Sequence, residues 1–259
     1  MEARGGPRGL FQTFAILVVL LVPATGAFAV PVSYTFSTGP VFAATNLSGG
    51  FNQALLDALS GMSVTGSFDY DSEVPLTGTS NGPSVFGQSN YLGAISNIAG
   101  SVGSLSFAGT GADGVVSVAD EGYAPPIPNF VPRDFLQASE NATGIVLDAL
   151  GLELVNVRLF WIEGIDFGQG PVPDFLSDGT LPGQLPSFQG RLALDFLSVD
   201  ALPGDFTTLS FAFFDALEVK PVAVAEPGSL SLFVLAGALL PIVAARRRRR
   251  RPLVRADLG

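Results

Sequence analysis

The chain has 259 residues, of which 47% are hydrophobic and only 14% are charged, and its formal net charge is −10. It contains no cysteine and no histidine, which excludes Cys/His zinc sites, disulfide frameworks, thiol nucleophiles and Ser-His-Asp triads. The acidic balance argues against nucleic acid as a partner, because binding to phosphates requires a basic surface.

The N-terminus has the three parts of a signal peptide in order. Two arginines lie near the start, an apolar run covers 14–22, and the small residues Ala27 and Ala29 suit a signal peptidase. As a helix the apolar run reaches about 14 Å, which is too short to cross a bilayer. Residues 1–29 are therefore predicted to direct export and to be removed after Ala29, so that the mature chain starts at Val30.

Residues 30–218 are predicted to form one all-β domain, because apolar and polar residues alternate along many short runs. The clearest run is 63–70, and 152–162 changes face near Val155, which predicts a bulge. Turn-forming Gly, Pro, Asn and Ser clusters separate the runs, so we expect a β-sandwich of jelly-roll type. The other expected strands are 34–36, 104–107, 115–118, 135–138, 145–147, 191–196 and 208–213.

One segment of the body has helical spacing instead. Phe51, Leu55 and Leu59 recur every four residues, which predicts a short helix over 51–60 that packs at one end of the sandwich.

The densest acidic cluster of the body suggests a metal site. Asp69, Asp71 and Glu73 would project from one face if the strand continued, and three carboxylates could hold calcium there. The alternative is a solvated strand end. Asp113, Asp120 and Glu121 form a weaker version of the same pattern.

Aromatic residues suggest a second kind of site, a platform on which sugar rings would stack. Tyr123 is the best candidate for exposure, whereas Trp161 lies in the most hydrophobic run and is expected to pack in the core. The other candidates for the platform are Tyr34, Tyr70 and Tyr91. A glycoside hydrolase would need only two carboxylates, but spacing along the chain does not identify a pair.

The C-terminal segment has the composition of a membrane span followed by a basic block. Residues 229–245 are apolar and as a helix reach about 25 Å, close to the ~30 Å hydrocarbon core. Residues 219–225 are predicted to link the domain to this segment. The Arg-rich end, 246–255, would stop translocation and remain in the cytoplasm. Its stop-transfer residues are Arg246, Arg247, Arg248, Arg249, Arg250 and Arg251.

The order of Glu226-Pro227, an apolar segment and an arginine block resembles the PEP-CTERM sorting tail of bacterial proteins that exosortase processes. The resemblance covers 226–259, and Ala225 stands where the family motif has its first proline. It implies that the tail enters the inner membrane transiently and that exosortase cuts near Glu226 and Pro227. The body then reaches the cell surface or the extracellular matrix, where such proteins are associated with exopolysaccharide and biofilm. A permanent single-pass anchor is the alternative for these residues.

These features together predict an exported bacterial protein of the cell surface or extracellular matrix, of structural or interaction type. We expect no catalysis and no cofactor, and the expected partners are signal peptidase, exosortase, the inner membrane and an extracellular polysaccharide. One alternative is a carbohydrate-binding module with calcium, and a second is a carboxylate-dependent glycoside hydrolase. Without its two terminal segments the body keeps four basic and 20 acidic residues, a net charge of −16. Such a surface would repel nucleic acid.

Overall fold

A computed structural model describes residues 31–81, 85–111, 114–124, 132–166, 171–187 and 189–223. The chain divides between Val222 and Ala223, and the fold below is that of the first unit. Its elements are β1 (Val32–Asn46), α2 (Gln53–Ala58), β2 (Ser63–Tyr70), β3 (Gly78–Ser80), β4 (Gln88–Leu92), β5 (Ile95–Val102), β6 (Leu105–Gly109), β7 (Val115–Tyr123), β8 (Arg133–Thr143), β9 (Val146–Leu147), the 3₁₀ helix η1 (Asp148–Leu150), β10 (Leu152–Ile162), β11 (Gly190–Ser198) and β12 (Ser210–Pro221). This content confirms the all-β class.

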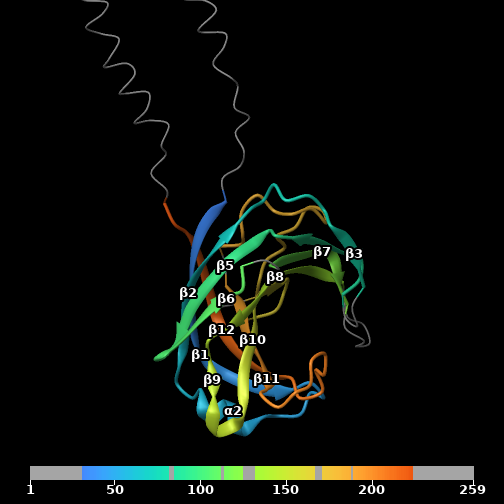
Figure 1. Ribbon diagram of the computed structural model, residues 1–259. Coiled ribbons are helices and arrows are strands. Elements are labelled where there is room, and N and C mark those ends of the chain that lie inside the picture. The colour runs from blue at the N-terminus through green and yellow to red at the C-terminus, as the bar shows by residue number, and fades with distance from the viewer. Residues whose placement is uncertain are drawn as a thin grey trace, which may run out of the picture. The chain divides into compact units, whose positions relative to one another are not determined.

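Eight antiparallel strands close into a ring (Figure 1). Around the ring the order is β1, β2, β5, β6, β8, β10, β11 and β12, after which β12 pairs with β1. Of the remaining four strands, β3, β4 and β7 extend the sheet beside β8, and the short β9 pairs with β10. The result is one closed, sandwich-like sheet.

The strand order corrects the jelly-roll prediction. The eight strands of the ring are arranged around it in their chain order, as in a meander, although other strands intervene in the sequence. A jelly roll would require Greek-key crossings instead. Alternating sequence patterns show which residues face inward, but a meander and a jelly roll produce the same alternation. The pairing partners therefore had to come from the structure.

Inward-facing side chains fill the ring with a single main core. The strand predicted over 63–70 is confirmed as β2, and its inward-facing residues Val64, Phe68 and Tyr70 are buried. Close packing also explains Gly66, since a Cβ there would lie 2.5 Å from Cζ of Phe36. The largest fully buried side chains are Trp161, Tyr70, Phe68, Phe196 and Phe214.

The ring closes across a fork at β8, where β7 and β6 diverge. Only Ala142 and Thr143 of β8 pair with β6, while the preceding part of β8 pairs with β7. The carboxylate of Glu140, 1% exposed, fills this fork and accepts the N–H groups of Ile98 at 2.9 Å and Gly111 at 3.0 Å. It thereby satisfies one amide of β5 and one of the segment that follows β6.

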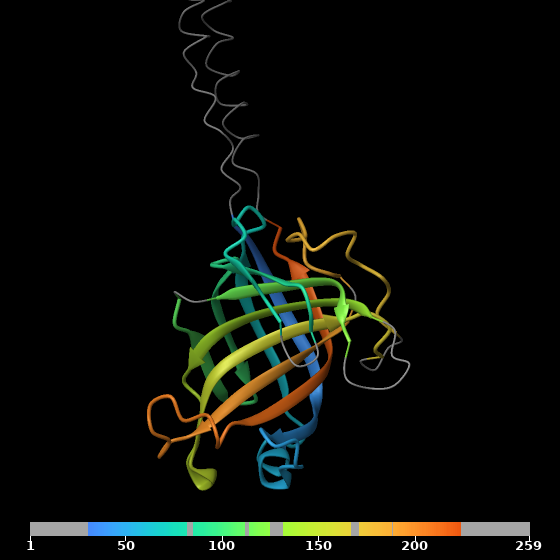
Figure 2. The same cartoon turned by 90° about the vertical axis from the view of Figure 1, so that its right-hand side faces the viewer.

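The helix α2 closes one end of the ring, which we call the helix end (Figure 2). Asn52 caps the helix by accepting the N–H of Leu55 at 3.1 Å. Leu55 and Leu59 are both 0% exposed and belong to the main core. A helix is present within the predicted 51–60, but it is shorter, because Phe51 forms a β-bridge with Thr45 and is 61% exposed.

The connection 171–187 closes the opposite end, where β1 begins and β12 ends (Figure 2, gold connection at the upper end). We call it the terminal end. Leu176 and Leu185 of this connection join the main core. Two core tyrosines also hold it by their hydroxyls, with Tyr91 donating to the carbonyl of Gly179 at 3.2 Å and Tyr70 to that of Pro182.

Several predicted boundaries differ from the observed ones. β1 runs on from the expected 34–36 to Asn46, because register shifts accommodate Gly39 and Pro40 without ending the strand. β12 extends to Pro221, so residues 219–221 are strand and not linker. The sequence patterns did not predict β3, β4 or β5.

Candidate functional site

The tyrosines and the tryptophan proposed as a sugar platform do not form an exposed surface. Trp161, Tyr34, Tyr70 and Tyr91 are buried in the main core, as the hydrophobic run around Trp161 predicted for that residue. Tyr123 is half-buried and stacks on Phe135, with ring centroids 6.2 Å apart and planes at 13°. The four buried rings stabilise the core, and one face of the Tyr123 ring is covered by Phe135.

Two of the three carboxylates proposed for calcium, Asp69 and Asp71, have separate local roles. Asp69 accepts hydrogen bonds from Oγ of Ser33 at 2.6 Å and from Nδ2 of Asn97 at 2.9 Å. Asp71 accepts the N–H of Glu73 at 2.9 Å, which is an Asx turn after the strand. Within the described ranges no group of three or more acidic side chains is placed to hold a metal ion.

The structure brings together a different set of acids, at the terminal end. Asp134 is buried, and its carboxylate accepts the N–H groups of Glu121 at 3.2 Å, Phe175 at 3.1 Å and Leu176 at 2.7 Å. Glu121 has a positive φ of 47° at a register shift in β7, so Asp134 stabilises an unusual backbone there. One buried carboxylate thus fixes both β7 and the connection 171–187.

Neighbouring acids respond to the charge of Asp134. A side-chain hydrogen bond to Asp134, followed by its negative charge, raises the pKa of Asp174. Partial desolvation and the same neighbouring charge raise the pKa of Asp120. Carboxyl groups that hydrogen-bond each other leave no room for a sugar between them, and glycosidases need a gap of roughly 5–10 Å. This cluster therefore fits a structural role better than catalysis.

Sequence reasoning singled out Asp120 but missed Asp134, Glu163 and Asp174. The main chain of Asp134 also contacts Glu163, donating its N–H to Oε2 at 3.2 Å. These residues come from segments that are far apart in the chain, and no spacing rule connects them. Only the strand pairing of β7 with β8, and the path of the connection 171–187, reveal the cluster.

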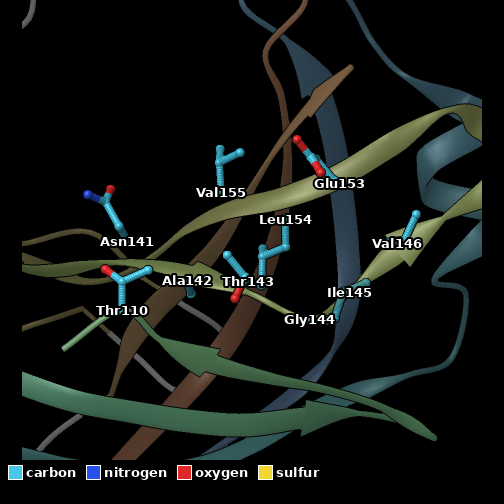
Figure 3. Close-up of a pocket in the computed structure, with 10 residues that line it drawn as sticks. All are labelled: Thr110, Asn141, Ala142, Thr143, Gly144, Ile145, Val146, Glu153, Leu154 and Val155. Atoms are coloured by element: carbon cyan, nitrogen blue, oxygen red, sulfur yellow. The ribbon is translucent and has the colours of Figure 1, made fainter. Parts of the chain in front are cut away.

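A hollow of about 200 Å³ lies on the outside, where β8 and β10 stop pairing (Figure 3). Asn141 and Thr143 line it from β8, and Glu153 and Val155 from β10 (Figure 3). Glu153 is the one carboxylate in its lining. A glycosidase needs two carboxylates, so the hollow does not provide that chemistry.

The first and last strands of the domain, which in sequence adjoin the two terminal segments with the predicted signal and sorting motifs, meet each other. We define the β1–β12 junction as residues 33–36 of β1 together with residues 219–222, at and just beyond the C-terminal end of β12. Tyr34 is the register partner of Pro221, and the N–H of Val222 donates to the carbonyl of Ser33 at 2.7 Å. The two ends of the domain therefore lie side by side.

The β1–β12 junction is firm on its inner side and weak at its tip. Val219 and Phe36 are register partners that are each 3% exposed, so both are held by the core. Lys220, Pro221 and Val222 are exposed. The ion pair of Lys220 with Glu218, at 2.8 Å, is also exposed and adds little stability.

The predicted signal and sorting residues lie outside the described residues. They comprise Ala27, Ala29, Glu226, Pro227 and the arginines 246–251. The predicted membrane span 229–245 lies there too, and among the described residues no helix has the length and apolar character to span a membrane. Export, sorting and anchoring stay predictions from the sequence.

Comparison with known proteins does not supply an assignment. No family model, no curated protein and no solved structure matches this chain.

Proposed function

We propose that this chain is an exported protein of the bacterial cell surface or extracellular matrix, with a structural or interaction role in the matrix and no catalytic one. Signal peptidase removes residues 1–29, the C-terminal tail enters the inner membrane transiently, and exosortase cuts near Glu226 and Pro227. The released body then associates with extracellular polysaccharide.

The position of the β1–β12 junction carries this proposal. The first strand begins at Val32, just after the predicted cut at Ala29, and the last ends at Pro221, just before Glu226. Both predicted cuts thus remove sequence without removing any part of a described strand. A domain with its ends in this arrangement suits removal of both terminal segments.

The roles of the clustered acids support a structural body over an enzyme. Asp134 holds three backbone N–H groups, and Glu140 holds two. Carboxylates engaged in this way stabilise the fold. We do not favour carbohydrate stacking as a separate function, because the tyrosines considered for it are buried or packed.

The experiment is to express the full chain in a bacterium that contains an exosortase and to determine the mass of the mature protein. We expect a chain that starts at Val30 and ends close to Glu226. Replacing Glu226 and Pro227 by alanine should leave the tail attached. A permanent anchor would keep the tail in both proteins, and that result would contradict the proposal.

A further inference from the structure

The predicted cut lies close in sequence to the last described backbone hydrogen bond of the domain. Val222 is bonded to Ser33, and only residues 223–225 separate it from Glu226. Three extended residues reach roughly 10 Å. A protease that cuts before Glu226 would therefore work almost against the end of the sheet.

Such a protease has to compete with β1 for the residues that precede the cut. Peptides commonly bind their recognition sites as extended strands, using main-chain hydrogen bonds and alternate side chains. The residues before the cut include Val222, whose N–H already donates to Ser33, and next to it Pro221, which pairs with Tyr34. While this end of β12 stays on β1, those residues are not available as an extended substrate.

The tip of β12 is built to separate over a short, fixed length. Lys220, Pro221 and Val222 are all exposed. The next residue inward, Val219, is 3% exposed and faces the equally buried Phe36. Opening residues 220–222 exposes little apolar surface, whereas opening Val219 would expose the core.

We propose that the tip of β12 controls the rate at which the sorting tail is removed. Residues 220–222 separate from β1 to let the protease bind, and Val219 stops the opening so that the ring stays closed. This inference rests on the proposed function, because it concerns the same cleavage. The partner that binds the opened tip is the protease that cuts near Glu226.

A spacer tests the inference directly. A six-residue Gly-Ser insertion after Val222 moves the cut away from the junction without touching any pair. We expect tail removal to become at least about five-fold faster, because the protease no longer has to wait for the backbone hydrogen bonds of residues 220–222 to open, and each such bond contributes about 1 kcal/mol. The matched control places the same insertion after Gly204, an exposed turn residue with φ of 84° between β11 and β12, and should leave the rate unchanged.

A reversible cross-link tests it in the opposite direction. Thr35 and Lys220 are exposed register partners, and the chain has no cysteine of its own. Paired residues in antiparallel strands have Cα atoms at a separation that a disulfide accepts. In membranes from the exosortase-bearing host, the Thr35→Cys, Lys220→Cys chain should lose its tail several-fold more slowly until a reductant is added.

The outcomes separate the two proposals. A faster cut with the spacer after Val222, together with a slow cut that reduction restores, supports control by the tip. Equal rates in all variants, with the tail still removed from the unaltered chain, would overturn this inference and leave the proposed function intact. If the unaltered chain keeps its tail and is indifferent to the Glu226 and Pro227 substitutions, both fail.

Discussion

At the helix end, α2 closes the ring with two leucines, Leu55 and Leu59. At the terminal end, by contrast, the connection 171–187 accepts hydrogen bonds from the hydroxyls of Tyr70 and Tyr91 and donates backbone N–H groups to the carboxylate of Asp134. The first closure is local in sequence and apolar. The second joins distant segments through polar groups, with leucines packing beneath it. The terminal end, where the chain enters and leaves the domain, therefore depends on polar groups that single substitutions can remove.

The largest effect is expected at the helix end. Leu55→Ala leaves a cavity in the main core and should lower the free energy of unfolding by about 3 kcal/mol. Urea denaturation of the purified mature protein measures it. Leu202→Ala is the matched control, because Leu202 is 72% exposed, and should cost less than about 0.5 kcal/mol. Equal losses would contradict an apolar closure by α2.

Removing the buried carboxylate should affect the terminal end selectively. Asp134→Ala leaves the N–H groups of Glu121, Phe175 and Leu176 without their acceptor, so we expect a loss of about 2–3 kcal/mol. Hydrogen exchange locates the damage, and the amides of Phe175 and Leu176 should exchange faster while that of Leu55 is nearly unchanged. Uniform acceleration at both ends would show that the two closures are not independent.

A smaller effect is expected from a single hydroxyl. Tyr70→Phe keeps the buried ring and removes only the donor to the Pro182 carbonyl, so it should cost about 1 kcal/mol. Tyr91→Phe, which removes the donor to Gly179, should behave alike. Thermal unfolding curves of the two variants give the comparison. No loss in either would mean that leucine packing alone holds the connection.

The smallest effect depends on pH. The neighbouring Asp134 raises the pKa of Asp174, so the folded chain holds this proton more tightly than the unfolded chain, and stability is lost as the pH rises through the raised pKa. Asp174→Asn removes the repulsion and should raise the melting temperature slightly at pH 7. The gain should vanish as the pH falls below the ordinary aspartate range. A gain that persists at low pH would have another cause.

The same comparison shows what the sequence could predict. The helix over 51–60 was readable because the spacing of Leu55 and Leu59 is local, and the strands 63–70 and 152–162 match β2 and β10. The irregularity expected near Val155 appears as a register shift between Leu154 and Asn156. These features depend on near neighbours only.

Other features depended on partners that spacing does not reveal. The meander order, the Glu140 fork and the Asp134 cluster each join segments far apart in the chain. Residues 219–221 looked like a linker because Pro221 and small neighbours favour irregular structure, yet pairing with β1 makes them strand. Of the residues considered for an aromatic platform, Tyr34 and Tyr70 lie inside the ring, because period-two alternation points them inward.

The most direct test of the account is the mass of the mature protein isolated from an exosortase-bearing host, with both of its ends sequenced. We predict a chain that begins at Val30 and ends within a residue or two of Ala225. A mature chain that begins at Met1, or one that still carries the arginines 246–251, would contradict the proposed processing.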